Sequence, residues 1–222
     1  MKQSRKKKEF AVIGLGRFGS SVAMELTQYG HYVLGIDINS QIVQNMADQL
    51  SQTACLDATQ EDALMAVDIE SFDAVIIGIG TDFENNLMIT AALTNLGVQH
   101  IICKALTEKQ QAILIKIGAD KVIQPESQMG KRLAKELAFP WLNEQINLGP
   151  EHTISEIKSP LELIGKSLVE AEIRKKYGIY ILIVKNHDIF LVSPPGEYII
   201  QPDDTLVIVG SHKQIDHFMN KK

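Results

Sequence analysis

Cysteine is scarce in this chain of 222 residues, which contains only Cys55 and Cys103. The two stand apart in apolar surroundings without C-x-x-C spacing, so the sequence indicates neither a disulfide framework nor a zinc site. We therefore expect two buried free thiols in a reducing compartment. The six histidines are scattered and show no metal-ligand spacing either.

Long apolar runs are also missing. No stretch approaches the ~18 residues that a bilayer-spanning helix needs, and no signal-peptide apolar region follows the basic start. We therefore expect a cytoplasmic protein.

An excess of positive charge is absent as well. The 22 lysines and arginines are outnumbered by 27 aspartates and glutamates, which argues against a nucleic-acid partner. The exception is the basic run KQSRKKK at residues 2–8. It is interpreted as a solvated tail, with contact to anionic lipid or an acidic partner as the alternative.

Alternating short strands and helices occupy residues 10 to about 126. Strands are predicted at residues 10–15, 32–37, 52–56, 72–80, 100–106 and 121–126. Helical patterns lie between them, and Asn39 or Ser40 can cap the second helix. Short connections of this kind favour right-handed crossovers, so we predict an α/β fold with a Rossmann-like doubly wound parallel sheet.

The pattern changes after this sheet. Residues 127–149 are predicted as a helix to about Ala138, interrupted at Pro140, with a short helical continuation over residues 141–146. The apolar side chains of this connector should pack onto their own domain or, equally well, onto a second subunit. They are Leu133, Leu137, Trp141, Leu142 and Ile146.

A small C-terminal α+β domain is predicted from residue 150 onward. Its expected strands are residues 152–159, 179–185, 189–193, 197–201 and 204–210, and its expected helices are residues 167–178 and 212–220. The core is marginal for a domain of this size, so we expect a homo-oligomer. The predicted divisions are a basic tail (1–8), a nucleotide-binding domain (9–127), linker helices (128–149) and the C-terminal domain (150–222).

Three glycines follow the first predicted strand with G-x-G-x-x-G spacing, directly before a helix. Gly14 permits the tight turn, Gly16 lets the backbone approach phosphates, and Gly19 allows close packing of helix on strand. Arg17 opposes the positive end of the helix dipole, a cost that makes sense if an anion binds there. The alternative is that Arg17 points to solvent.

Polar residues at the ends of later strands extend this candidate site. Asp37 would accept hydrogen bonds from both ribose hydroxyls and disfavours a 2′-phosphate, so NADP is not expected. Asn39 could reach the ribose or only cap a helix. Asp57 could accept from an adenine amino group or N-cap a helix that begins near Thr59.

The remaining candidates end the fourth, fifth and sixth strands. Gly78 and Gly80 should leave room for a ligand, while Lys104 and Glu126 carry charge at the same edge and could pair with each other. The complete candidate set is Gly14, Gly16, Arg17, Phe18, Gly19, Asp37, Asn39, Asp57, Ala58, Thr59, Gly78, Gly80, Lys104 and Glu126.

Catalytic equipment is not evident. The chain has no Tyr-x-x-x-Lys pair, no spacing of histidine and acid for a proton relay, and no G-x-x-x-x-G-K-[ST] loop. The leading hypothesis is therefore a nucleotide sensor and not an enzyme. An NAD-dependent oxidoreductase and a redox-sensing NAD(H) regulator are the alternatives, because NAD and ATP share the adenosine half.

Five segments in combination carry a family resemblance: FAVIGLGRFGSSVAMEL, GIDIN, LDAT, IGADKVIQPESQMGKRLA and IRKKYGIYILIVK. Together they resemble the cytosolic regulatory subunits of Ktr potassium-uptake systems, in which an RCK (KTN) domain precedes an RCK_C (TrkA-C) domain. The similarity covers residues 10 to about 218.

The resemblance implies dimers that assemble into an octameric ring under a membrane potassium-channel subunit. It also implies that each RCK domain binds ATP or ADP, with ATP favouring conduction, and that residues 129–146 swap between paired subunits. Arg17 would then reach the γ-phosphate of the neighbouring subunit's nucleotide. Asp37 and Asn39 would hold ribose, Asp57 adenine, and Glu126 would lie near Mg²⁺ or another divalent cation.

The resemblance further implies that the C-terminal domain binds cyclic di-AMP at a dimer interface, which inactivates the channel. Arg174 would contact the phosphates of this second ligand. Leu168, Tyr180 and Pro195 would surround its base.

Overall fold

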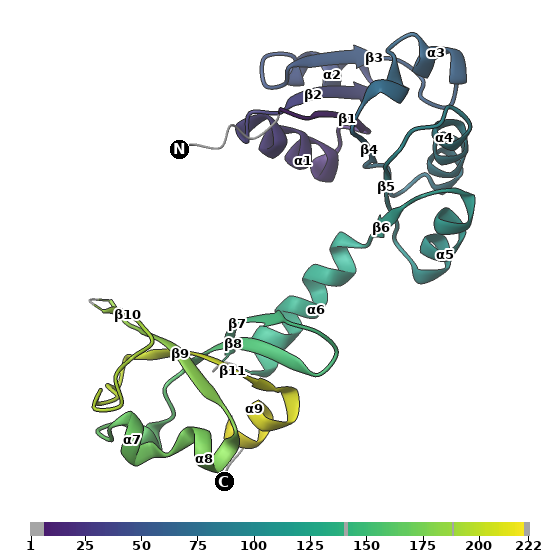
Figure 1. Cartoon of the computed structure of the whole chain (residues 1–222). Coiled ribbons are helices and arrows are strands. Elements are labelled where there is room, and N and C mark those ends of the chain that lie inside the picture. Colours follow the sequence, from purple (N-terminus) through teal and green to yellow (C-terminus); the bar gives the residue numbers. More distant parts are fainter. Residues whose placement is uncertain (1–6, 140–141, 188, 220–222) are drawn as a thin grey trace. The chain divides into compact units, whose positions relative to one another are not determined.

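The computed structural model describes residues 7–139, 142–187 and 189–219. The chain forms two units, Met1–Gly130 and Lys131–Lys222 (Figure 1). The basic run predicted as a tail lies almost wholly outside the described residues.

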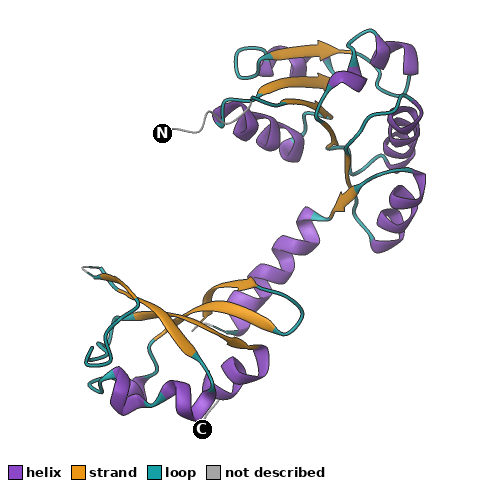
Figure 2. Ribbon diagram, in the orientation of Figure 1, coloured by secondary structure: helices purple, strands orange, loops and turns teal. Residues whose placement is uncertain are grey.

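The first unit is built on a six-stranded parallel sheet in the order β3-β2-β1-β4-β5-β6 (Figures 1 and 2). Its strands are β1 (Glu9–Ile13), β2 (Tyr32–Asp37), β3 (Gln52–Cys55), β4 (Ala74–Ile77), β5 (Ile101–Lys104) and β6 (Lys121–Ile123). The strand order reverses between β1 and β4, which is where open α/β sheets form a ligand crevice. The predicted doubly wound fold is therefore confirmed.

Helices cover both faces of this sheet. They are α1 (Arg17–Gln28), α2 (Ser40–Met46), α3 (Glu61–Met65), α4 (Phe83–Asn95) and α5 (Glu108–Ile117), with the short 3₁₀ helix η1 (Ile69–Ser71). Successive residues of β1 enter different cores, because Val12 packs with Ala23 of α1 whereas Ile13 belongs to a cluster with Ile89 of α4. Burial on both faces explains why these strands are almost continuously apolar.

The second unit contains a five-stranded antiparallel sheet in the order β10-β9-β11-β8-β7 (Figure 2). Its strands are β7 (Leu142–Asn147), β8 (His152–Lys158), β9 (Tyr180–Lys185), β10 (Phe190–Val192) and β11 (Thr205–Ser211). Its helices are η2 (Leu161–Leu163), α7 (Leu168–Ala171), α8 (Ile173–Tyr177) and α9 (His212–Met219), and α6 (Pro125–Ala138) crosses from the first unit into the second. The core joins sheet residues such as Ile157 and Ile208 to Phe218 of α9.

The predicted helical continuation after Pro140 is wrong where the structure describes it. Leu142–Asn147 forms strand β7, in which Ile146 pairs with Ile154 and Asn147 with Thr153 of β8. Pairing along an open sheet edge outweighs the weak helix preference of a segment with two asparagines.

Two further predictions for the second unit are wrong. The single helix expected over residues 167–178 is interrupted at Glu172, which has a left-handed backbone (φ 47°) and separates α7 from α8. The strand expected over residues 197–201 is reduced to one bridge between Ile199 and Ser167. Its backbone instead bonds the loop before α7, since Gly165 N donates to Ile200 O at 2.9 Å and Ile200 N donates to Lys166 O at 3.0 Å.

The cysteines differ from each other. Cys103 is buried beside Thr90, and burial raises the pKa of its thiol to about 11. Cys55 is exposed, so its predicted burial is wrong. It ends β3, an edge strand of the first sheet, which pairs with a neighbouring strand, β2, on one side only.

Helix α6 has an apolar stripe that is exposed in the described part of the chain. Met129, Leu133 and Leu137 follow one another at four-residue spacing and are 62%, 53% and 72% exposed. Leu133 and Leu137 therefore do not pack onto their own domain, and Ile146 is also exposed. Trp141 and the side chain of Leu142 lie outside the described residues. In the described part of the chain, none of the helices has the length and apolarity needed to cross a bilayer.

Candidate nucleotide-binding site

The glycine turn between β1 and α1 is packed against β4. Gly14 has a left-handed backbone (φ 86°), and its N–H donates to Ile36 O of β2 at 2.8 Å. A Cβ on Gly19 would lie 1.9 Å from Gly14 O, and a Cβ on Gly78 would lie 2.8 Å from the same oxygen. Both glycines are therefore required for the turn to fit between helix and strand.

The N-terminus of α1 is open. Gly16 is the N-cap and supplies no side-chain hydrogen bond, and the first turn of the helix contains no acidic residue. A Cβ on Gly16 would meet no atom within 4 Å, so there is space above this turn. Arg17, the first residue of the helix, is exposed beside that space. Unpaired N–H groups, the helix dipole and a guanidinium together favour a phosphate.

Asp37 and Asn39 already have structural partners at the end of β2. The Asp37 carboxylate accepts from Leu15 N at 2.8 Å and from Asn39 N at 2.9 Å, which ties the glycine turn to β2. The Asn39 side chain accepts from Gln41 N at 3.0 Å and Ile42 N at 3.4 Å. The predicted capping role of Asn39 is therefore confirmed.

Asp57 stabilises the turn after β3. Its carboxylate accepts from the hydroxyl and the N–H of Thr59, at 2.7 and 3.0 Å. These bonds lower the pKa of the Asp57 carboxyl below its usual value. Because α3 begins at Glu61 with Gln60 as its N-cap, the prediction that Asp57 N-caps a helix near Thr59 is wrong.

Two cavities that share Gly14, Asp37 and Ile79 lie at the carboxyl ends of the strands. The larger, of about 830 Å³, is lined by Gly14, Gly16, Arg17, Phe18, Ser21, Asp37, Ile42, Gly78, Ile79, Gly80, Thr81, Lys104 and Glu126. The smaller, of about 230 Å³, includes Asp57, Ala58 and Thr59. The structure thus brings twelve of the fourteen candidates to these walls, and Gly19 and Asn39 line neither.

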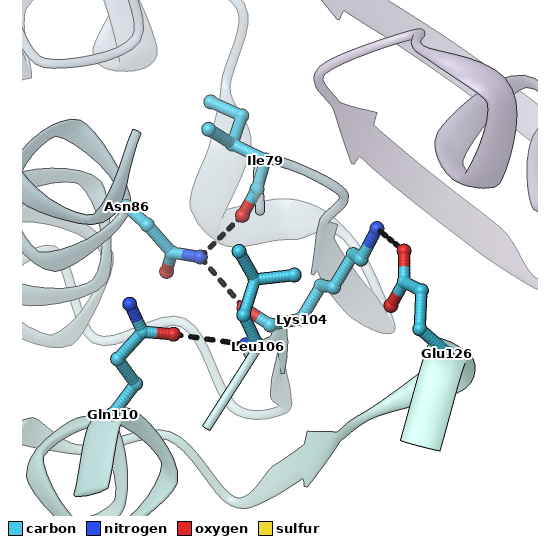
Figure 3. Close-up of polar contacts among 6 residues, drawn as sticks. All are labelled: Ile79, Asn86, Lys104, Leu106, Gln110 and Glu126. Atoms are coloured by element: carbon cyan, nitrogen blue, oxygen red, sulfur yellow. Dashed lines mark hydrogen bonds and ion pairs between the residues drawn. The ribbon is translucent and has the colours of Figure 1, made fainter. Parts of the chain in front are cut away.

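Lys104 and Glu126 form an ion pair at the wall of the larger cavity (Figure 3). Lys104 Nζ lies 2.6 Å from Glu126 Oε1, which confirms the predicted pairing. This hydrogen bond is the main reason that the pKa of the Glu126 carboxyl is lowered. Lys104 Nζ also lies 5.8 Å from the centroid of the Phe18 ring, within cation–π distance.

Gly80 accommodates this lysine. A Cβ on Gly80 would lie 3.0 Å from Lys104 Cε, so the glycine makes room for the Lys104 side chain. The prediction that Gly78 and Gly80 leave room for a ligand stays a prediction. Both line the larger cavity, but the space beside their α-carbons is filled by the glycine turn and by Lys104.

Two residues of this region were not predicted from the sequence. Ile79 lines both cavities, and Asn86 of α4 is buried beneath them. Ile79 continues the apolar run of β4, so the sequence alone does not distinguish it from a core residue. Asn86 lies on the buried stripe of α4. A polar residue at a helix position that is otherwise apolar is the sequence signal that points to such a residue.

A separate cavity of about 450 Å³ lies in the second unit, lined by Leu168, Val169, Glu172, Ile173, Arg174 and Lys175. Arg174 Cζ lies 4.6 Å from the centroid of the Tyr180 ring. Pro195 does not line this cavity, although the loop that contains it is bonded nearby, since Val169 N donates to Gly196 O at 2.9 Å.

Both units match domain families of known proteins. Residues 10–125 match the TrkA-N domain and residues 152–222 match the TrkA-C domain. The chain is 38% identical over 216 residues to Ktr system potassium uptake protein A of Bacillus subtilis, covering 97% of each chain. The chain belongs to the Ktr potassium-uptake protein family.

Other similarities agree with this Ktr family assignment. Ktr system potassium uptake protein C of B. subtilis is 37% identical over 212 residues, which are 96% of each chain. Among solved structures, the GsuK channel aligns with a TM-score of 0.69 over 98% of this Ktr-family chain and 40% of the channel chain. At 17% sequence identity, this last likeness supports the fold alone.

Proposed function

We propose that this chain is the regulatory subunit of a Ktr-type potassium-uptake system, binding ATP or ADP in its first unit and gating a membrane channel subunit without turning the nucleotide over. The observation that carries the nucleotide assignment is the open N-terminus of α1, with Arg17 beside it, facing the 830 Å³ cavity. The family relatives supply the connection to potassium uptake.

The walls of the two cavities fit the parts of an adenine nucleotide. Phosphates belong over Gly16 and the first turn of α1, where N–H groups and the positive end of the helix dipole are available. Ribose hydroxyls would donate to Asp37, whose carboxylate retains acceptor capacity beyond its two backbone bonds. The adenine amino group would donate to Asp57 in the smaller cavity. Arg17, following the family resemblance, would serve the neighbouring subunit's nucleotide.

A divalent cation could bind here only if the nucleotide supplied some of its ligands. Within the described residues there is no cluster of three histidine, cysteine, aspartate or glutamate side chains that could hold a metal. Glu126 offers one carboxylate, a ligand that Mg²⁺ accepts, and phosphate oxygens and water would supply the others. The ion would neutralise phosphate charge close to Glu126.

The exposed stripe of α6 supports pairing with a second copy. Three large apolar side chains at four-residue spacing form one face of a helix, and such a face is stable when another protein surface covers it. We infer that α6 packs onto a second subunit, and that such dimers build the octameric ring that the family resemblance implies, located in the cytoplasm beneath the channel subunit.

Gating would follow from linkage. A ligand shifts an equilibrium between two conformations only by the difference in its affinity for them. ATP exceeds ADP by one phosphate, and a contact made to that phosphate in one state alone supplies ~1–3 kcal/mol per site. Repeated around a ring, this difference biases a gate strongly.

Equilibrium binding of ATP, ADP, NAD and NADH to the purified chain, with and without Mg²⁺, tests this proposal. We expect ATP and ADP to bind more tightly than either dinucleotide, and Mg²⁺ to strengthen ATP binding. Titration calorimetry measures all eight conditions directly. NADH binding far ahead of ATP would overturn the proposal in favour of a redox-sensing NAD(H) regulator or an NAD-dependent oxidoreductase.

A second ligand, cyclic di-AMP, is proposed for the 450 Å³ cavity of the second unit because Leu168 and Arg174 line it and Tyr180 contacts Arg174. Arg174→Ala should weaken cyclic di-AMP binding about tenfold or more, since a charge-assisted phosphate contact is lost. ATP and ADP affinities should not change. Lys158→Ala, which removes an exposed charge of the same unit, is the control. Equal cyclic di-AMP affinity in wild type and Arg174→Ala would contradict this assignment.

A further inference from the structure

Asn86 is a polar residue in an otherwise apolar environment. It lies on the buried stripe of α4 with Ile89, Thr90 and Leu93, and it is 1% exposed. Burying an amide is unfavourable unless its hydrogen bonds are satisfied. At 1% exposure the side chain cannot itself contact a ligand, so its effect must pass through the groups that it binds.

The Asn86 amide joins the ends of two neighbouring strands (Figure 3). Its nitrogen donates to Ile79 O at 2.6 Å and to Lys104 O at 2.8 Å. The last backbone pair of β4 and β5 is Ile77 with Cys103, so these two carbonyls lie just beyond the ladder. Asn86 therefore supplies a side-chain link between the segments that follow the last backbone pair of β4 and β5.

This link fixes the backbone of Lys104, from which its side chain extends. The next residues are also fixed, because Ala105 N donates to Ile123 O at 2.8 Å and Leu106 N donates to Gln110 Oε1 at 2.9 Å (Figure 3). With its backbone held on both sides, Lys104 extends over Gly80 towards Glu126, and its side chain is only 12% exposed. A lysine held in this way loses little conformational entropy when it binds a phosphate.

We propose that Asn86 is a positioning residue of the nucleotide cleft, which holds the Lys104 backbone so that the Lys104 ammonium faces both Glu126 and the phosphates of the bound nucleotide. The phosphate contact rests on the proposed function. The positioning of Lys104 does not, because it concerns contacts within this chain.

Lysine acetylation read by mass spectrometry tests the positioning without any nucleotide. In the wild-type chain Lys104 should react more slowly than the exposed Lys116, because it is shielded and paired with Glu126. Asn86→Leu, and Asn86→Ala as a smaller second variant, should accelerate acetylation of Lys104 several-fold relative to Lys116. Leu93→Ala is the matched control, since Leu93 is fully buried on the same helix stripe but its side chain has no polar atom that could link to Ile79 or Lys104.

Binding of ADP and ATP then tests the phosphate contact. Asn86→Leu should weaken both about tenfold, as Lys104→Met should, and the double variant should bind no more weakly than Lys104→Met alone. Unchanged Lys104 acetylation in both Asn86 variants, or losses in the double variant that simply add, would overturn the positioning role. If the wild-type chain binds neither nucleotide, the proposed function fails while the acetylation result still decides the role of Asn86.

Discussion

Replacing Gly19 with alanine should unfold the glycine turn and abolish nucleotide binding. The added Cβ would lie 1.9 Å from Gly14 O and 3.0 Å from Gly14 C, and both are backbone atoms that cannot rotate away. Relief requires α1 to move off β1, which breaks the core around Val12 and Ala23. We expect the first unit to lose about 3 kcal/mol or more of unfolding free energy and its melting temperature to fall by about 10 °C.

Gly16→Ala is the matched control for this prediction. Gly16 has φ −64°, which alanine adopts without strain, and its Cβ would meet nothing within 4 Å. Stability should fall by less than about 1 kcal/mol, the scale of a changed N-cap. The methyl group would nevertheless occupy the space proposed for phosphate, so ATP and ADP should bind more weakly. Calorimetric unfolding and nucleotide titration of both variants separate the two effects. A Gly19→Ala chain with wild-type melting temperature would show that α1 and β1 are not packed as closely as described.

The parallel sheet could be predicted because its strands and the starts of its helices are both recognisable from local sequence. Most of the strands are short apolar runs, and α1, α2, α4 and α5 start after Gly16 or after the capping residues Asn39, Asp82 and Thr107. The glycine turn was equally predictable, since its spacing is fixed by steric contacts within one strand–helix connection. The candidate residues gathered at two cavities for the same reason: the carboxyl ends of parallel strands share one edge.

What the sequence could not predict depends on contacts between distant segments. Residues 142–147 form strand β7 because their backbone pairs with β8. Nothing within these residues alone excludes a helix. Gly80 makes room for the Lys104 side chain, a contact between residues 24 positions apart. Asn86 has a function only once α4 lies under the ends of β4 and β5. Such residues resemble ordinary core or loop positions until the packing is known.

Arg17→Ala should weaken ATP binding selectively. A charge-assisted hydrogen bond to phosphate contributes on the order of 1.5–3 kcal/mol, so the ATP dissociation constant should rise about tenfold or more. ADP lacks the γ-phosphate that Arg17 is proposed to contact, and its affinity should change little. The chain itself should be no less stable, because removing a cation from the positive end of α1 relieves an unfavourable interaction with the helix dipole. Parallel titrations with ATP and ADP measure the selectivity, and thermal unfolding measures the stability.

Two further variants separate a specific phosphate contact of Arg17 from a general effect of its charge. Lys116→Ala removes the same charge from an exposed position in the last turn of α5 and should leave both affinities unchanged. Arg17→Lys keeps the charge but loses the planar pair of donors, so its ATP affinity should lie between those of wild type and Arg17→Ala. Equal losses for ATP and ADP in Arg17→Ala would mean that the guanidinium contacts the phosphates that both nucleotides share. In that case Arg17 would help to hold the nucleotide, and the discrimination between ATP and ADP would have to arise from Lys104, Glu126 and the cation.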